Sequence, residues 1–235
     1  MTPEPRCDFS LAHYRELLEA ARSGGYRFAG FDGPPREGDL IVRHDVDVSL
    51  EAAVRMAEVE AEAGAWSTWF LMTRSVFYNL DSEVGERTIA RLRELGGRIG
   101  HHAVWPHVDL DDRFEAVVAW HNPDLDYVAK PVVGATNVMA PPFYDPERFR
   151  SDSNHRWSHR GNAHDCPHAA LAGGELEWLH VVVHPVIWVF DGQTMRQTME
   201  SFLDADRRSR LDHLRADRID LSGRGARLAP RHGRK

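Results

Sequence analysis

Residues 39–72 read DLIVRHDVDVSLEAAVRMAEVEAEAGAWSTWFLM, and this stretch decides the fold class. The apolar segment Asp39–Arg43 predicts a strand. Ser49 is suited to cap a helix whose apolar residues recur at helical spacing, and Gly64 is suited to end it. Trp66–Met72 is a near-continuous apolar run, as in buried parallel strands. Strand, helix and strand joined by short turns therefore predict a parallel β-α-β unit.

The same alternation continues along the chain. Asp81 opens a second predicted helix that runs to Leu95, and residues 98–101 form the next predicted strand. This order predicts an α/β fold with a mostly parallel sheet wound right-handedly, either open or closed into a barrel. Flanking helices are predicted over residues 10–21 and 194–217, and later strands over 132–138 and 179–184.

Two stretches, roughly residues 103–130 and 140–175, show no regular periodicity. Loops of that length inside a compact domain are usually functional. We therefore expect them to surround the site.

Composition predicts one ordered domain over residues 1–221 and a basic, disordered tail over 222–235. The chain has 235 residues, of which 42% are hydrophobic, and this suits a single domain. Its formal net charge of −7 argues against nucleic acid as a partner. The tail carries five Lys or Arg residues, no acidic residue and little apolar surface to bury.

The start of the chain and its cysteines favour a cytoplasmic protein without a membrane partner. Residues 1–10 lack the basic and apolar regions of a signal peptide, and no apolar run approaches the ~18 residues that a membrane span needs. Cys7 and Cys166 are the only cysteines, so we expect reduced thiols instead of a disulfide framework.

Polar side chains gather where three predicted strands end. Asp45 and Asp47 follow the first strand, a histidine-rich run over residues 101–107 follows the third, and His184 closes the last. Ligands and catalytic groups collect at the carboxyl ends of the strands in α/β sheets and barrels. We therefore expect these side chains to meet in one site.

The chemistry of these groups matches a hydrolytic metal site. Asp47, His102 and His107 can supply the two-histidine, one-carboxylate set that holds a catalytic ion and leaves a position for water. Such an ion acidifies water and polarises a carbonyl. Asp45 can then act as general base, and His184 can protonate the leaving amine.

The order of the motifs resembles that of the polysaccharide deacetylase superfamily, also called NodB-like or carbohydrate esterase family 4. The matching elements are HDVD at 44–47, a histidine pair after GGRIG at 96–100, SDSNHRW at 151–157 and VVVHP at 181–185. Asp-x-Asp in the first motif is typical of a divergent branch of that family. The resemblance covers about residues 39–190. It implies an irregular or incomplete (β/α) barrel around one divalent ion, zinc or another transition metal.

The resemblance also implies roles for individual residues. Asp45 would be the base, Asp47 and the histidine pair the metal ligands, and His184 the acid. Asp152 would orient the imidazole of the acid, and Trp157 would form a wall of the acetyl pocket. The remaining expected substrate-binding residues are Trp105, Trp188 and Tyr144.

The second motif departs from the family pattern. Members usually have three residues between the two histidines, whereas His102 and His107 have four between them and His101 and His107 have five. Because neighbouring residues in a strand face opposite sides, only one of His101 and His102 can point into the site. We assign His102.

The third motif departs as well. Family members carry an arginine there that contacts the base, but residues 139–144 (MAPPFY) contain none. Arg43 or Arg160 could substitute.

The favoured function is hydrolysis of a carbon–nitrogen amide bond, as in deacetylation of an N-acetylated sugar or a related small amide. One alternative is a catalytically altered or inactive protein that binds a carbohydrate in a glycan or secondary-metabolite pathway. A second is a non-haem iron oxygenase, although the usual H-x-D element is absent. The loop over residues 155–168 has four histidines and one cysteine. It could hold a second metal, but we favour a polar lid facing the substrate.

Overall fold

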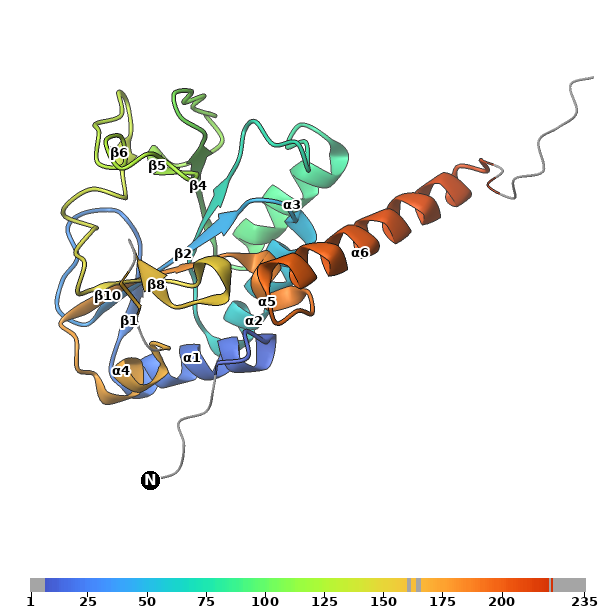
Figure 1. The fold of residues 1–235 in the computed structure, drawn as a ribbon. Coiled ribbons are helices and arrows are strands. Elements are labelled where there is room, and N and C mark those ends of the chain that lie inside the picture. The colour runs from blue at the N-terminus through green and yellow to red at the C-terminus, as the bar shows by residue number, and fades with distance from the viewer. Residues whose placement is uncertain (1–6, 160–161, 164–165, 220, 222–235) are drawn as a thin grey trace, which may run out of the picture.

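The computed structural model describes residues 7–159, 162–163, 166–219 and 221. Its main element is one curled sheet flanked by helices, which confirms the incomplete (β/α) barrel (Figure 1). The strands in the described part are β1 Arg27–Ala29, β2 Asp39–Val46, β3 Thr68–Leu71, β4 Arg98–Ala103, β5 Val117–Trp120, β6 Thr136–Asn137, β7 Phe149–Ser151, β8 Ser158–His159, β9 Asn162–Ala163 and β10 Trp178–Val183. The helices there are α1 Leu11–Ser23, α2 Leu50–Ala63, α3 Glu83–Glu94, the 3₁₀ turn Ser153–His155, α4 His168–Gly173, α5 Pro185–Val189 and α6 Met195–Ala216.

The curled sheet runs in the order β6-β5-β4-β3-β2-β10-β7, and β1 pairs with the start of β2. Each of these described pairings is parallel. The carboxyl ends of β2, β4, β5 and β10 therefore lie along the same edge. This edge is where a barrel of this type places its site.

The side chains of β2 alternate between two cores. Leu40, Val42 and Val46 belong to the larger core, which also contains side chains of α1, α2 and α5. Ile41 points to the opposite face and packs with Phe31, Phe70, Val117, Ala119, Val138 and Phe143 inside the curl of the sheet. The period of two therefore directs Arg43 and Asp45 to the inner face with Ile41.

The outer face of β2 carries a buried polar cluster. His44 Nε2 lies 2.6 Å from Glu60 Oε1 on α2, and the His44 ring stacks on Trp69 at 3.7 Å between centroids. The hydroxyls of Tyr14 and Ser67 donate to Glu60 over 2.6 and 2.7 Å. These contacts fasten α1 and α2 to the central strands.

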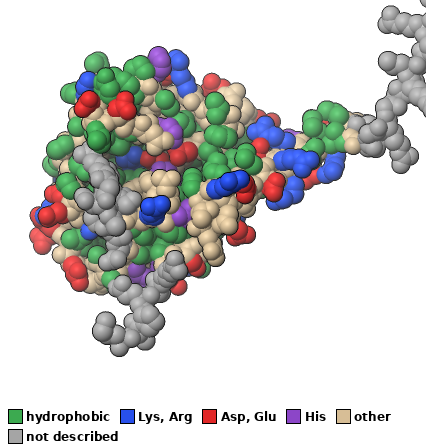
Figure 2. Space-filling model, in the orientation of Figure 1, with side chains coloured by type: hydrophobic (Ala, Val, Ile, Leu, Met, Phe, Trp, Pro, Cys, Tyr) green, Lys and Arg blue, Asp and Glu red, His purple; other side chains and the backbone are tan. Residues whose placement is uncertain are grey.

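The helices begin with the expected caps. Ser49 and Thr194 accept from the backbone N–H three residues on, and Gly64 ends α2 with a φ of +65°. α6 extends away from the body of the molecule, and charged side chains cover its projecting part (Figures 1 and 2). Within the described residues, no helix has the length and apolar character that crossing a membrane requires.

The irregular stretches contain more structure than predicted. The stretch 103–130 includes β5, and 140–175 includes β7 and α4. The strand expected over 132–138 is confined to Thr136–Asn137, because residues 132–135 form an isolated bridge in a turn. The basic tail over 222–235 and residue 160 lie outside the described residues.

Candidate metal and acid-base site

The inner face of four strands supplies the candidate site. Asp45 and Asp47 continue the inner-facing positions of β2, and His102 and His121 do so on β4 and β5. His184 follows β10 two positions after inner-facing Val182. Parallel pairing brings these positions to one edge, where Figure 2 shows acidic and histidine side chains in a hollow of the surface.

Asp47, His102 and His121 form a candidate metal-binding cluster. Asp47 Oδ1 lies 3.0 Å from His102 Nε2 and 3.1 Å from His121 Nδ1, and these two ring nitrogens are 3.2 Å apart. Ligand atoms at ~2.1 Å from a tetrahedral ion lie roughly 3.4 Å from one another. The three atoms are therefore close to the separation that a zinc-sized ion requires.

The protonation of His102 supports the fit to a cation. Its Nδ1 lies 3.1 Å from the carbonyl oxygen of Ala119, which can only accept, so Nδ1 carries a proton. Nε2 therefore faces Asp47, where it can donate to the carboxylate or, as a lone pair, bind a cation held between the two groups. The backbone carbonyl is the outer partner that a metal-bound histidine usually has.

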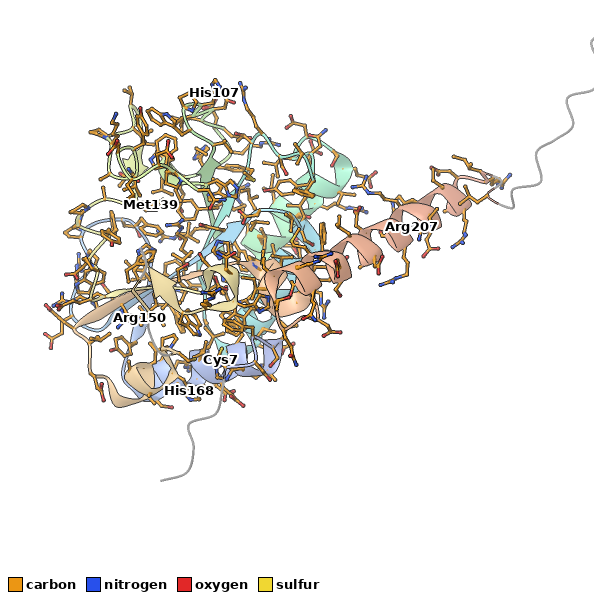
Figure 3. The ribbon with its side chains drawn as sticks, viewed as in Figure 1. Cys7, His107, Met139, Arg150, His168 and Arg207 are labelled. Atoms are coloured by element: carbon orange, nitrogen blue, oxygen red, sulfur yellow. The ribbon has the colours of Figure 1, made fainter. Side chains whose placement is uncertain are left out.

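His121 takes the place in the cluster that we expected for His107, which is not among the three clustered residues. His107 is exposed in the loop after β4, where its backbone N–H donates to Val104, and it lies at the edge of the molecule (Figure 3). It lines a pocket of about 620 Å³ that opens onto Asp47, His102 and His121. His107 can therefore contact a ligand in this pocket.

His101 is directed away from the cluster, as strand alternation requires. Its Nδ1 lies 3.2 Å from the carbonyl of Val117, and its Nε2 accepts from the backbone N–H of Asp111. Both ring nitrogens are therefore used in holding the loop after β4. The choice of His102 over His101 agrees with this geometry.

Arg43 is the arginine that contacts the predicted base. Its Nε and Nη2 donate to the two carboxylate oxygens of Asp45 over 2.7 and 2.5 Å, and both side chains are buried. Burial alone would raise the pKa of Asp45, but the charge of Arg43, and then that of His102, lowers it to about 2. Asp45 is therefore ionised at neutral pH.

His184 is held by a buried carboxylate. Its Nδ1 donates to Asp152 Oδ1 over 2.6 Å, and its backbone N–H donates to Asp152 Oδ2 over 3.0 Å. Burial lowers the pKa of His184, but the charge and hydrogen bond of Asp152 outweigh it and raise the pKa to about 9. Because Nδ1 is engaged, Nε2 is the nitrogen left for proton transfer.

The pKa values of Asp47 and His121, in the candidate metal-binding cluster, are also shifted. Burial would raise the pKa of Asp47, but hydrogen bonds from His102 and His121 hold it far below its usual range. The hydrogen bond to Asp47 raises the pKa of His121 against the effect of burial. The cluster is therefore anionic at its carboxylate, as a cation site should be.

The four aromatic residues that we expected to bind substrate do not lie together in the structure. Trp188 and Trp157 are buried, and Trp188 Nε1 donates to Asp152 Oδ2 over 2.6 Å, so Trp188 positions the acid side of the site. Trp105 lies in the loop after β4 and stacks on Tyr127 at 4.2 Å between centroids. Tyr144 packs against Phe149.

Met72, Phe77, Met195 and Met199 line the pocket over the cluster, together with Arg74. The pocket wall beside the cluster is therefore largely apolar, with an ion pair between Arg74 and Asp109.

Searches against protein-family models, curated proteins and solved structures found no match to this chain.

Proposed function

We propose that this protein is a metal-dependent hydrolase that removes an acyl group from an amide. The observation that carries the proposal is the joint placement of three functions at one sheet edge. Asp47, His102 and His121 converge as ligands, Asp45 is held ionised by Arg43, and His184 is held protonated by Asp152. This pairing of an ionised carboxylate and a charged histidine is what amide hydrolysis needs.

The ligand set suits zinc. Two histidines and one carboxylate are a common catalytic zinc set, and they leave a coordination position for water or substrate. An ion held there lowers the pKa of water and polarises the acyl carbonyl. Other transition metals use the same ligands, so metal analysis must decide among them.

The residues of the chain then divide the proton transfers. A water molecule attacks the acyl carbon, and Asp45 accepts its proton as the new carbon–oxygen bond forms. The carbon–nitrogen bond breaks as His184 Nε2 delivers a proton to the departing nitrogen. Asp152 stabilises the imidazolium before this step and fixes its orientation.

The proposed substrate is an N-acetylated sugar or a related small amide. This choice rests on the resemblance to polysaccharide deacetylases, and the pocket above the cluster supports it with space for a small ligand. Met195 and Met199 from α6 would contact the acyl or ring carbons. The Arg74–Asp109 ion pair would contact hydroxyl groups of the substrate.

The test combines metal analysis with acetate release. The full chain should bind an ion at Asp47, His102 and His121, and should release acetate from a panel of N-acetylated sugars. His121→Ala should abolish this binding, whereas the matched variant His107→Ala should retain it. Asp45→Asn and His184→Ala should retain the metal but lose roughly 10²–10⁴-fold in kcat.

Two results would refute the proposal. One is wild-type protein that binds no ion when supplied with zinc, manganese, cobalt or iron. The other is full metal content in Asp47→Ala, which would remove the carboxylate from the ligand set.

A further inference from the structure

A second group of metal-ligating side chains lies apart from the site described above. Cys7 precedes α1, His13 is on α1 and Cys166 precedes α4. One ligand atom from each lies within 4.8 Å of the other two, and His13 Nε2 is 3.2 Å from Cys166 Sγ. Cys7 is on the opposite side of the molecule from His107 in Figure 3. Residues about 150 positions apart therefore place two thiols and an imidazole together.

The imidazole is oriented for metal binding. His13 Nδ1 lies 3.0 Å from Glu16 Oε2 one turn further along α1. A proton on Nδ1 satisfies that carboxylate and leaves the Nε2 lone pair directed toward the sulfur atoms. A carboxylate–histidine pair of this kind is a common outer partner of metal-bound imidazole.

Both sulfur atoms receive N–H donors. Trp157 Nε1 donates to Cys7 Sγ over 3.4 Å, and the backbone N–H of His168 donates to Cys166 Sγ. The hydrogen bond from Cys166 lowers the pKa of Cys7 to about 5, whereas Cys7 and burial raise the pKa of Cys166, so an ion would have to displace the proton of Cys166. Both cysteines are free thiols in the structure.

His168 lies beside this group, near His13 and Glu16. Its ring lies 5.6 Å from that of His13 between centroids, and its ligand nitrogen lies within 4.8 Å of those of His13 and Glu16. His168 Nδ1 is buried and has no hydrogen-bond partner among the residues that the structure describes.

We propose that Cys7, His13 and Cys166 bind a second, structural divalent metal ion of the zinc class. Two thiolates balance the charge of the ion, and soft sulfur ligands favour zinc over magnesium or calcium. The site uses none of the residues assigned to hydrolysis. Its success or failure is therefore independent of the proposed function.

The location gives this ion a stabilising and positioning role. It would join the N-terminal segment and α1 to the segment before α4. His13 also stacks on Trp188 at 6.3 Å between centroids, and Trp188 donates to Asp152, which holds His184. Loss of the ion should therefore lower Tm and loosen the support of His184.

Cobalt(II) supplied to the reduced, full-length protein tests the proposal. Thiolate ligands give a sulfur-to-cobalt charge-transfer band in the near ultraviolet, whereas the cluster of Asp47, His102 and His121 contains no sulfur. Wild type should bind two ions and show the band. Cys166→Ser should lose one ion and the band, and Asp47→Ala should lose the other ion and keep the band.

Circular dichroism of each variant shows whether it has folded, and the band in wild type does not depend on any variant. A reduced wild type that binds cobalt without the band would overturn the proposal. So would unchanged metal content in folded Cys166→Ser. A third contrary result is a Cys7–Cys166 disulfide in protein purified without reductant, seen as a mass lower by two hydrogen atoms together with no uptake of metal after reduction.

Discussion

Asp152→Asn should lower the pKa of His184 and convert it from a proton donor to a neutral imidazole at weakly alkaline pH. The substitution keeps the shape of the side chain but removes its charge. Asp152 has no exposed surface, and it accepts from His184 Nδ1, His184 N–H and Trp188 Nε1. An amide has one oxygen to serve these three donors, so the orientation of His184 should suffer as well.

The size of the effect follows from the shift in the pKa of His184. Asp152 is the main cause that raises the pKa of His184 from 6.5 to about 9, and burial acts in the opposite direction. Removing the charge should therefore return the pKa to about 6.5 or below, which corresponds to roughly 3 kcal/mol. At about pH 8 the protonated fraction would fall roughly 30-fold, whereas at about pH 6 it would change less than about twofold.

Two measurements check this. Nuclear magnetic resonance of ring-labelled histidine gives the pKa of His184 directly in the metal-free wild type and in Asp152→Asn, and His184→Gln identifies its signal. The alkaline limb of the pH dependence of kcat should lie at lower pH in the variant than in wild type. If His184 titrates near 6.5 in both proteins, the carboxylate does not control the imidazole and the reasoning fails.

Three further outcomes are expected. Glu60→Ala should lower the free energy of unfolding by about 3–5 kcal/mol in urea denaturation, because Tyr14 and His44 lose a buried charged partner. A loss below about 1 kcal/mol would show that Glu60 does not hold these helices to the sheet. Arg43→Met should raise the pKa of Asp45 above its value of about 2, because Asp45 stays buried but loses its cationic partner. The acid limb of the pH–rate profile should then move to higher pH, and an unmoved limb would show that the pair does not keep the base ionised. Metal-free wild type should lose stability relative to Asp152→Asn as pH rises from about 6.5 through about 9, because the raised pKa of His184 stabilises the fold only below its folded-state pKa. Thermal unfolding across that range measures the difference, and a Tm that changes equally with pH in both proteins would refute it.

Local signals in the sequence were enough to predict the framework. The β-α-β unit over residues 39–72 combines apolar strands with a capped amphipathic helix, and the structure has β2, α2 and β3 there. These features depend on neighbours within a few residues, so they can be read without knowing the fold. The predicted parallel sheet and incomplete barrel followed from that alternation and from the resemblance.

His121 was missed although the sequence carries the same signal that located the other site residues. Val117–Trp120 is a short apolar run followed at once by a histidine, as Leu179–Val183 is followed by His184. A four-residue strand inside a long loop is weak evidence by itself, because its pairing with β4 and β6 is decided by distant residues. His107 was assigned instead, because the family pattern places the second histidine of this motif a few residues after the first.

Arg43 could have been chosen over Arg160 from strand geometry. Arg43 and Asp45 are two residues apart in one strand, so their side chains must share a face. The structure shows them in a bidentate pair on the inner face of β2. By contrast, the Cys7–His13–Cys166 group joins three segments that only tertiary packing brings together. The composition of the loop over residues 155–168 pointed to a second metal, but it could not indicate Cys7 and His13 as partners of Cys166.

The central strand β2 carries buried charges on both faces, and the two faces explain them differently. On the outer face His44 and Glu60 join helices to the sheet, within a network that also satisfies Tyr14 and Ser67. On the inner face Arg43 and Asp45 pair within one strand, where Arg43 lies over the ring of Phe70 and Asp45 Oδ2 is 3.9 Å from His102 Nε2. A buried ion pair of this kind is often no more stabilising than apolar packing. Stability therefore accounts for the outer pair but not for the inner one. An arginine and a carboxylate kept in the interior beside three converging metal-ligand atoms are better explained by chemistry at the site, where an ionised carboxylate has a use.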